Sequence, residues 1–451
     1  MIKAIHSLTR REFILALNGV SRHSYPIEDL KHLKGREVQL QKIEQAVLTK
    51  GRHVFVFGER GVGKTSLAKT AGKTGAHSPR EFRQIGCAAG TSFEEILRQI
   101  IEAYGSDKLT QVERTKGWSF SLKDFGFKNQ QLVRQDAPKL SASTAADILA
   151  SLDEDDPFAD GRIFVIDEMD KLEDKSVKEA FADLIKLIGD RACRTTIIFT
   201  GVGRDFREIL GHHPSSYRHL LQIPLERLDY NPALDIIDDV LQRFELGWEE
   251  EPTRTARFRV ADIANGFPYY VHLVVEKLMH ALYADKEAED ITAKHLSTAI
   301  ENAVLDVEEV IRAPYEAAVS GRSRDIKLAV WAAADSWDLE RGASQIYASY
   351  VGICERVGHP SLESKKFSAL LGRLKGPSYG AILKGGMRRG LYEFTENITR
   401  GYVRLCAAAD GVELVDARYK NPRPVVTAQA RAARRYIDPR SLGGPPSTLR
   451  R

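Results

Sequence analysis

One short glycine-rich stretch of this 451-residue chain has the residue types needed to hold a phosphate group. It reads Gly-Glu-Arg-Gly-Val-Gly-Lys-Thr, follows the apolar run His53–Phe57 and precedes a predicted helix. Glycines let successive N–H groups converge on an anion, and the helix start adds its positive end. Lys64 can reach the β- and γ-phosphates of ATP, and the Thr65 hydroxyl can ligate Mg²⁺. The predicted nucleotide-binding residues are Gly58, Glu59, Arg60, Gly61, Val62, Gly63, Lys64, Thr65 and Ser66.

Two carboxylates follow a second apolar run roughly a hundred residues later. Ile163–Ile166 is succeeded directly by Asp167 and Glu168. A carboxylate at the end of a buried strand can hold Mg²⁺, which is the role we expect for Asp167. Glu168 is placed to orient and polarise an attacking water. The sequence therefore predicts an ATPase that uses Mg²⁺ and forms ADP and phosphate.

The elements around these residues alternate between strand and helix. Apolar strands are predicted at 53–57, 82–87, 162–166, 195–200 and 221–225, and helices at 36–49, 64–73, 92–104, 145–152 and 178–188. This alternation indicates an α/β fold with a parallel sheet covered on both faces. Residues 229–315 are predicted to be almost wholly helical.

The order of these elements resembles the P-loop AAA+ ATPases. Leu33–Glu37 looks like their N-terminal box beside the adenine, and Phe199–Gly201 matches their sensor 1 position. The resemblance implies that Thr200 contacts the γ-phosphate or its water. Ser215–Arg218 precedes the fifth strand, where the family has its arginine finger. Arg218 is then expected to reach the ATP of a neighbouring subunit, so a homo-oligomer is implied; on sequence alone, an ordinary surface arginine stays an alternative.

One position departs from the family pattern. Gly266-Phe267-Pro268-Tyr269 stands where these ATPases often have Gly-x-Pro-Arg, so Tyr269 replaces the sensor 2 arginine. The departure implies slow hydrolysis or weak coupling of the helical lid to nucleotide. Arg254 or Arg257 could supply the missing cation, and Tyr269 itself is expected in the lid core or beside the adenine.

Residues 323–406 have the pattern of a winged helix. Helices are predicted at 325–334, 343–357 and 363–374, and a β-hairpin at 381–394 has a basic tip. Such a module places its third helix in a groove of double-stranded DNA and its wing on the phosphates. A protein-binding winged helix stays an alternative. The candidate DNA contacts are Lys365, Lys366, Arg373, Lys375, Arg388 and Arg389.

The whole arrangement resembles the origin-recognition and replication-licensing ATPases, whose winged helices carry a run similar to Gln345–Tyr350. Asp167–Leu172 and Ser215–Arg218 also look like bacterial transposition and genome-defence ATPases. Three functions follow: a nucleotide-controlled switch or assembly factor on DNA, a regulatory ATPase for a nuclease or transposase effector, or a nucleotide-locked structural protein.

Composition gives the remaining expectations. The four cysteines are widely spaced and no apolar run approaches the ~20 residues of a membrane span, so a cytoplasmic protein without a membrane partner is expected. Residues 418–451 hold nine lysines or arginines and one acid, a disordered basic arm suited to a polyanion or simply to solubility. We divide the chain into an N-terminal extension (1–32), a core (33–228) with an insertion (105–141) that could bind DNA or pack on the core, a lid (229–320), a winged helix (321–409) and a tail (410–451).

Overall fold

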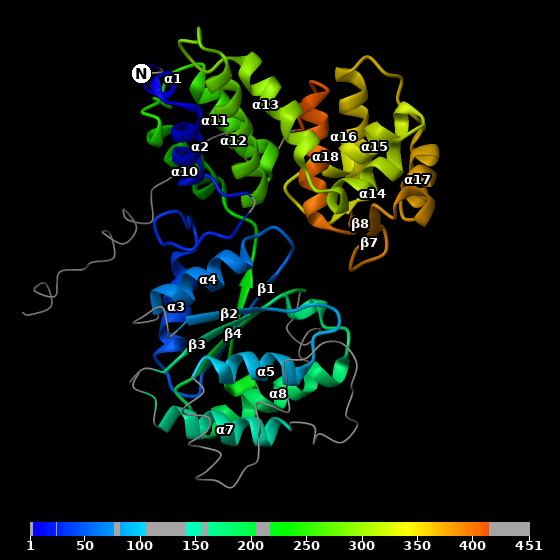
Figure 1. Cartoon of the computed structure of the whole chain (residues 1–451). Coiled ribbons are helices and arrows are strands. Elements are labelled where there is room, and N and C mark those ends of the chain that lie inside the picture. The colour runs from blue at the N-terminus through cyan, green and yellow to red at the C-terminus, as the bar shows by residue number, and fades with distance from the viewer. Residues whose placement is uncertain are drawn as a thin grey trace, which may run out of the picture.

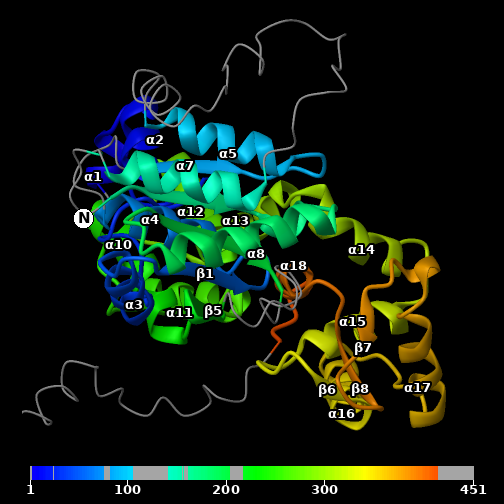
Figure 2. The same ribbon diagram turned by 90° about the horizontal axis from the view of Figure 1, so that it is seen from below.

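The computed structural model describes residues 3–23, 25–75, 82–104, 141–154, 156, 161–203 and 217–414. The expected insertion up to residue 140, Ser215, Ser216 and the basic arm from residue 415 lie outside the described residues. Figure 1 shows a sheet-containing lobe below and two helical lobes above it. In the view from below, the C-terminal lobe extends away from the sheet (Figure 2).

The lower lobe contains the predicted parallel sheet. Its strands are β1 (His53–Gly58), β2 (Phe82–Gly86), β3 (Ile163–Asp167), β4 (Thr196–Val202) and β5 (Leu220–Leu225). They run in the order β2-β3-β4-β1-β5, with every recorded pairing parallel. This order places the ends of β1, β3 and β4 side by side at one edge, where a parallel sheet has its ligand sites.

The side chains of β1 alternate between two apolar cores. Val54 and Val56 join the core formed with α3 (Glu37–Val47) and α4 (Lys64–Gly75). Phe55 and Phe57 join the other core, with α5 (Phe93–Glu102), α7 (Ala142–Glu154) and α8 (Lys175–Asp190). Successive side chains of a strand point to opposite faces, so a continuous apolar run is what a strand covered on both sides requires.

The N-terminal residues pack on the helical lid. The lid consists of α10 (Tyr230–Arg243), α11 (Thr253–Ala264), α12 (Pro268–Ala284) and α13 (Ala293–Asp306). The first two helices of the chain are α1 (Lys3–Ser7) and α2 (Arg10–Asn18). The ring of Phe13 in α2 stacks on the ring of Tyr283 in α12, with 4.2 Å between the ring centres. The Tyr283 hydroxyl also donates to the Leu8 carbonyl at 3.0 Å. These contacts hold the N-terminal helices against α12 of the lid.

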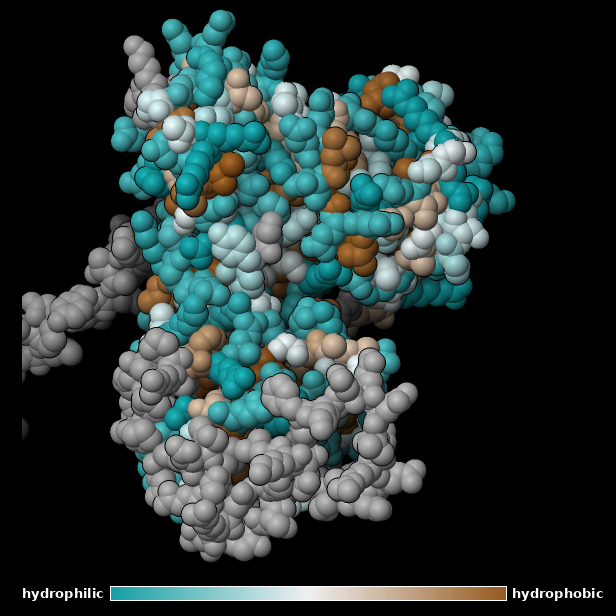
Figure 3. Space-filling model, viewed as in Figure 1, coloured by the Kyte–Doolittle hydropathy of each residue, from teal (hydrophilic) through white to brown (hydrophobic). Residues whose placement is uncertain are grey.

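The C-terminal lobe contains the three predicted helices and the predicted hairpin. These are α15 (Arg324–Ala334), α16 (Ala343–Arg356) and α17 (Ser364–Arg373), followed after η3 (Pro377–Tyr379) by β7 (Leu383–Gly385) and β8 (Leu391–Phe394). Both partners of β8 are antiparallel, since it lies between β7 and the short β6 (Arg341–Gly342). On the face shown in Figure 3 this lobe is largely hydrophilic, with apolar side chains exposed only in small groups.

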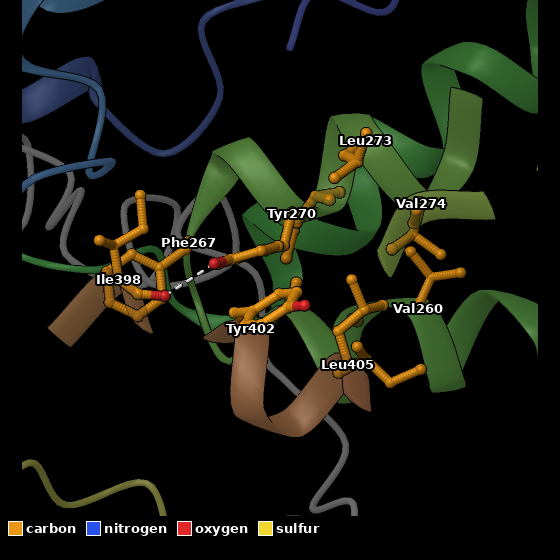
Figure 4. Close-up of a cluster of buried hydrophobic side chains, with 14 of the residues drawn as sticks. Val260, Phe267, Tyr270, Leu273, Val274, Ile398, Tyr402 and Leu405 are labelled. Carbon is orange, nitrogen blue, oxygen red and sulfur yellow. Dashed lines mark hydrogen bonds between the residues drawn. The ribbon is translucent and has the colours of Figure 1, made fainter. Parts of the chain in front are cut away.

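A last helix, α18 (Asn397–Ala409), joins this lobe to the lid and to α14 (Glu309–Val319). Its buried Arg404 donates to the carbonyl of Asp262 in α11 at 3.0 Å and to that of Ala334 in α15 at 2.9 Å. Figure 4 shows the apolar contact, where the Tyr270 hydroxyl of α12 donates to the Ile398 carbonyl at 2.7 Å. Buried guanidinium and phenol groups are stable only with such partners, so these bonds fix how α18 docks.

None of the described helices is both long and apolar enough to cross a membrane. All four cysteines are buried and free of disulfides.

Candidate nucleotide-binding site

The phosphate loop connects β1 directly to α4, as the sequence predicts. Gly61 and Gly63 have φ angles of 80° and 95°, which a side chain would strain. A Cβ atom on Gly61 would also lie 2.7 Å from the Cδ1 atom of Ile398 in α18, so this side chain would have to shift. The loop therefore needs glycine for its backbone conformation and lies against a side chain of the C-terminal lobe.

Asp167, the last residue of β3, is the centre of a hydrogen-bond network that joins it to α4, β4 and β2. The Thr65 hydroxyl donates to its Oδ1 atom at 3.0 Å, and the Thr200 hydroxyl donates to the same oxygen. Gln84 of β2 donates to its Oδ2 atom at 2.9 Å. Asp167 is only 6% exposed, and these three donors offset the cost of burying a carboxylate. Sequence reasoning missed Gln84, because a lone glutamine in a short strand indicates no particular chemistry.

Glu168 leaves the strand with a backbone turn that changes the direction of its side chain. Its φ is 63°, a left-handed conformation that is uncommon outside glycine. Its N–H donates to the Thr200 hydroxyl at 3.1 Å, and its half-exposed carboxylate pairs with Lys171 at 2.6 Å. Glu168 therefore faces the solvent-accessible side of the site while Asp167 stays buried.

Lys64 is held inside the loop. Its ammonium group donates to the Glu59 carbonyl at 2.7 Å. Burial lowers the pKa of Lys64 to about 8, although nearby carboxylates, led by Asp170 and Asp167, oppose the shift. A buried ammonium with a lowered pKa gains from an anionic ligand, because the ligand's charge replaces the lost hydration.

Two residues of the loop contact other lobes through their side chains. Arg60 pairs with Glu308, just before α14, at 3.1 Å. The Glu59 carboxylate accepts a hydrogen bond from the Asn397 amide at the start of α18. The side chains of Glu59 and Arg60 thus connect the loop to the C-terminal lobe and to the residue before α14, which leaves only their backbone N–H groups for the predicted phosphate binding.

A cavity of about 550 Å³ continues from the loop toward the lid and the N-terminal residues. Tyr269 forms part of its wall, and burial raises the pKa of Tyr269 to about 12, so the phenol is neutral. Neither alternative cation reaches this wall: Arg257 pairs with Asp238, and Arg254 lies over the ring of Phe258. The suggestion that one of them replaces the sensor 2 arginine is therefore not supported.

Arg218 lies far from the phosphate loop of its own chain. It is exposed and comes just before β5, whose first residue Leu220 pairs with His53, the first residue of β1. The phosphate loop begins at Gly58, at the other end of β1 and five residues on, or about 17 Å at about 3.3 Å per residue. Arg218 is therefore not brought together with Lys64, Thr200 and Asp167 within one chain.

The six candidate DNA contacts are all exposed on the C-terminal lobe. Lys365, Lys366 and Arg373 lie on α17, and Lys375 follows it with its ammonium 5.4 Å from the centre of the Tyr392 ring. Arg388 and Arg389 lie in the turn between β7 and β8. A helix and a hairpin tip of one small module thus both carry cations.

The sheet order, the phosphate loop and the buried strand-end carboxylate together make up a P-loop fold of the AAA+ type. A family model described as an AAA domain matches residues 48–210, which confirms the resemblance to AAA+ proteins expected from the sequence. No curated protein sequence matches the chain.

Similar solved structures span nearly the whole chain at low identity. The Walker-type ATPase of Pyrococcus abyssi is 16% identical, covers 84% of this chain and 99% of its own, and has a TM-score of 0.49. Cdc6p from Pyrobaculum aerophilum is 17% identical, with coverage of 87% and 98% and a TM-score of 0.40. The Aeropyrum pernix ORC1 protein, solved in complex with DNA, is 15% identical, with coverage of 82% and 92% and a TM-score of 0.43.

Proposed function

We propose that this chain is an ATP-dependent DNA-binding switch, which assembles on double-stranded DNA and hydrolyses ATP slowly in the cytoplasm. The observation that carries the proposal is the direct contact between the phosphate loop and the lobe that bears the six exposed cations. Asn397 and Ile398 of α18 touch Glu59 and Gly61 of the loop. A change at either place is therefore transmitted through packed side chains to the other.

The nucleotide chemistry follows from the oxygens gathered at Asp167. Mg²⁺ prefers oxygen ligands, and the Thr65 hydroxyl and the Asp167 carboxylate, 3.0 Å apart, are a donor set that fits it. When bound, Mg²⁺ neutralises charge on the phosphates. Lys64 adds a second cation from the loop. Glu168 would orient the attacking water, with Thr200 fixed beside it through the Glu168 N–H.

Arg218 would act on a neighbouring copy. Arg218 lies at the end of β5 that is away from the phosphate loop of its own chain, and its exposure leaves the guanidinium accessible to another subunit. An arginine supplied by a second subunit can stabilise charge that develops during phosphoryl transfer. A homo-oligomer with ATP at the subunit interfaces therefore fits the site.

The C-terminal lobe would bind DNA as a winged helix. Its α17 carries Lys365, Lys366 and Arg373, and its hairpin tip carries Arg388 and Arg389. A helix of this kind fits the major groove, while cations on the hairpin fit the phosphate backbone. Such contacts give affinity that falls steeply with salt.

Anisotropy titrations of labelled duplex DNA at low salt, with and without ATP and Mg²⁺, test this proposal. We expect binding that ATP strengthens, that weakens when the six cations are changed to glutamine, and that loses its response to ATP in Lys64→Ala. A matched variant changes Lys42 and Lys50, two exposed lysines of the core, and should bind DNA like wild type. Absence of DNA binding at low salt would refute the proposal, and a co-purifying nuclease or transposase would then favour the effector alternative.

A further inference from the structure

Residues 22–23 and 25–27 of the N-terminal extension line the nucleotide cavity, and their neighbours contact the lid and the helix after the phosphate loop. At the lid end, the Ser21 hydroxyl donates to the His272 carbonyl at 3.1 Å. At the other end, the Ile27 N–H donates to the Ser66 hydroxyl at 3.1 Å, and Glu28 pairs with Lys69 at 3.2 Å. Ser66 is the residue directly after Thr65. These described residues form an N-terminal wall of the cavity, which is bonded to the lid at Ser21 and to the helix after the loop at Ile27 and Glu28.

His272 of α12 lines this cavity and is only 3% exposed. Its Nδ1 atom accepts a hydrogen bond from the Arg22 N–H at 3.4 Å. Burial lowers the pKa of His272 to about 4, so the ring is neutral near pH 7 and its proton is on Nε2. That Nε2–H makes no hydrogen bond to any described residue. It is thus a buried donor in the wall of a ligand cavity.

His32 lines the same cavity and presents the opposite function. Its Nδ1 atom lies 2.6 Å from Asp29 Oδ1, and because a carboxylate only accepts, this nitrogen carries the proton. In the neutral ring the Nε2 atom is then an acceptor, and among the described residues it too has no hydrogen-bond partner. The Arg22 N–H thus leaves His272 with a donor at Nε2, and Asp29 leaves the neutral ring of His32 with an acceptor at Nε2.

We propose that His272 and His32 select adenine as the base of the bound nucleotide, with His272 donating to a purine ring nitrogen and His32 accepting from the exocyclic amine. This inference rests on the proposed nucleotide site and names its base specificity. Adenine presents an amine next to a ring acceptor, whereas guanine presents a carbonyl oxygen where adenine has the amine. The lone pair of His32 would face that oxygen without a proton between them. A site built to bond a particular group rejects the analogue that leaves its polar atoms unpaired.

Both Nε2 atoms are shielded from solvent, so a base must displace the side chains that cover them. Satisfying two buried polar atoms favours that displacement, because an unpaired buried donor or acceptor is costly. The groups that contact the base then come from the lid helix α12 and from residue 32, and the phosphate loop contributes neither of them.

Competition against a ribose-labelled fluorescent ATP analogue, with the full chain and Mg²⁺, measures the selectivity. We expect wild type to bind ATP at least about tenfold more tightly than GTP, and about tenfold more tightly than purine riboside triphosphate, which lacks the amine. His32→Ala should bind ATP and the amine-free analogue equally. His272→Ala should lose about tenfold in ATP affinity, and His272→Gln, which keeps an N–H donor, should recover part of the loss.

The control is His359→Ala, because His359 also pairs with an aspartate, Asp325, but lies in the C-terminal lobe. It should keep the wild-type selectivity. Equal wild-type affinity for ATP and the amine-free analogue overturns the base-selection proposal without any variant, and so does a preference for GTP. Wild-type selectivity in both alanine variants overturns it as well. If the proposed nucleotide site itself is wrong, the result differs from all of these. Wild type then binds no triphosphate, or Lys64→Ala binds every triphosphate as tightly as wild type does.

Discussion

Raising the pH from 7 to 9 should weaken nucleotide binding through one residue, Lys64. Burial lowers its pKa to about 8 in the protein without a phosphate beside it. At that pKa the ammonium form falls from ~0.9 of the molecules at pH 7 to ~0.1 at pH 9. Only the charged form attracts the triphosphate. If the neutral form contributed nothing, affinity would fall about tenfold between these two values of pH.

The sign of this effect is set by linkage. A bound triphosphate favours the ammonium form, so the pKa of Lys64 is higher in the complex than in the free protein. Binding therefore takes up a proton when the pH exceeds about 8, and affinity falls as the pH rises through that value. Below about pH 7 the lysine is already charged and contributes no further dependence on pH.

Isothermal titration with ATP and Mg²⁺ at pH 7, 8 and 9, at constant ionic strength, provides the measurement. The matched variant is Lys64→Arg, which keeps its charge across this range and should bind with a flat profile even if its absolute affinity is lower. Subtracting the two profiles removes the titration of the nucleotide and of other groups. Identical profiles, or a wild-type affinity that rises with pH, would refute the assignment of a lowered pKa to Lys64.

Four other outcomes are expected. Glu168→Gln should keep ATP binding but lower steady-state phosphate release by about a hundredfold or more, and equal release would remove Glu168 from the mechanism. Arg218→Ala should be inactive alone yet regain turnover when mixed with Glu168→Gln, whereas an active Arg218→Ala would exclude a shared site. Tyr270→Phe should lower the free energy of unfolding in urea by about 1–2 kcal/mol, because it removes a buried hydrogen bond to α18; an unchanged midpoint would contradict this. Changing both Arg388 and Arg389 to alanine should weaken DNA binding uniformly and reduce the salt slope by about 2, so an unchanged slope would exclude the hairpin tip.

The sheet and the phosphate loop could be predicted because their signals are local. A buried parallel strand must be apolar throughout, and the loop must have glycine where the backbone turns, so His53–Gly58 and Gly61–Lys64 are recognisable in isolation. The cap of α5 is equally local, and Ser92 accepts the Glu95 N–H as the spacing indicates. The three helices and the hairpin of the C-terminal lobe follow from the same kind of periodic pattern.

The contacts that shape the site could not be predicted, because they join residues far apart in the chain. Gln84 bonds Asp167 across 83 positions, and Arg22 bonds His272 across 250. For Arg254 and Arg257 the sequence suggested a contact that the structure does not contain. Their charge made them candidates for the cavity, but one lies over Phe258 and the other pairs with Asp238. A side-chain type indicates which bonds a residue can make, while only the packing decides which it makes.

The docking of α18 on the phosphate loop has a thermodynamic consequence. Gly61 lies close to Ile398, and Glu59 accepts a hydrogen bond from Asn397. The loop that would bind the nucleotide is therefore the same loop that α18 contacts. Any ligand of the C-terminal lobe that moves α18 must alter the affinity for nucleotide, and nucleotide must alter the affinity for that ligand by the same factor. A single measured ratio of affinities, obtained from either side, would give the coupling free energy between the two lobes.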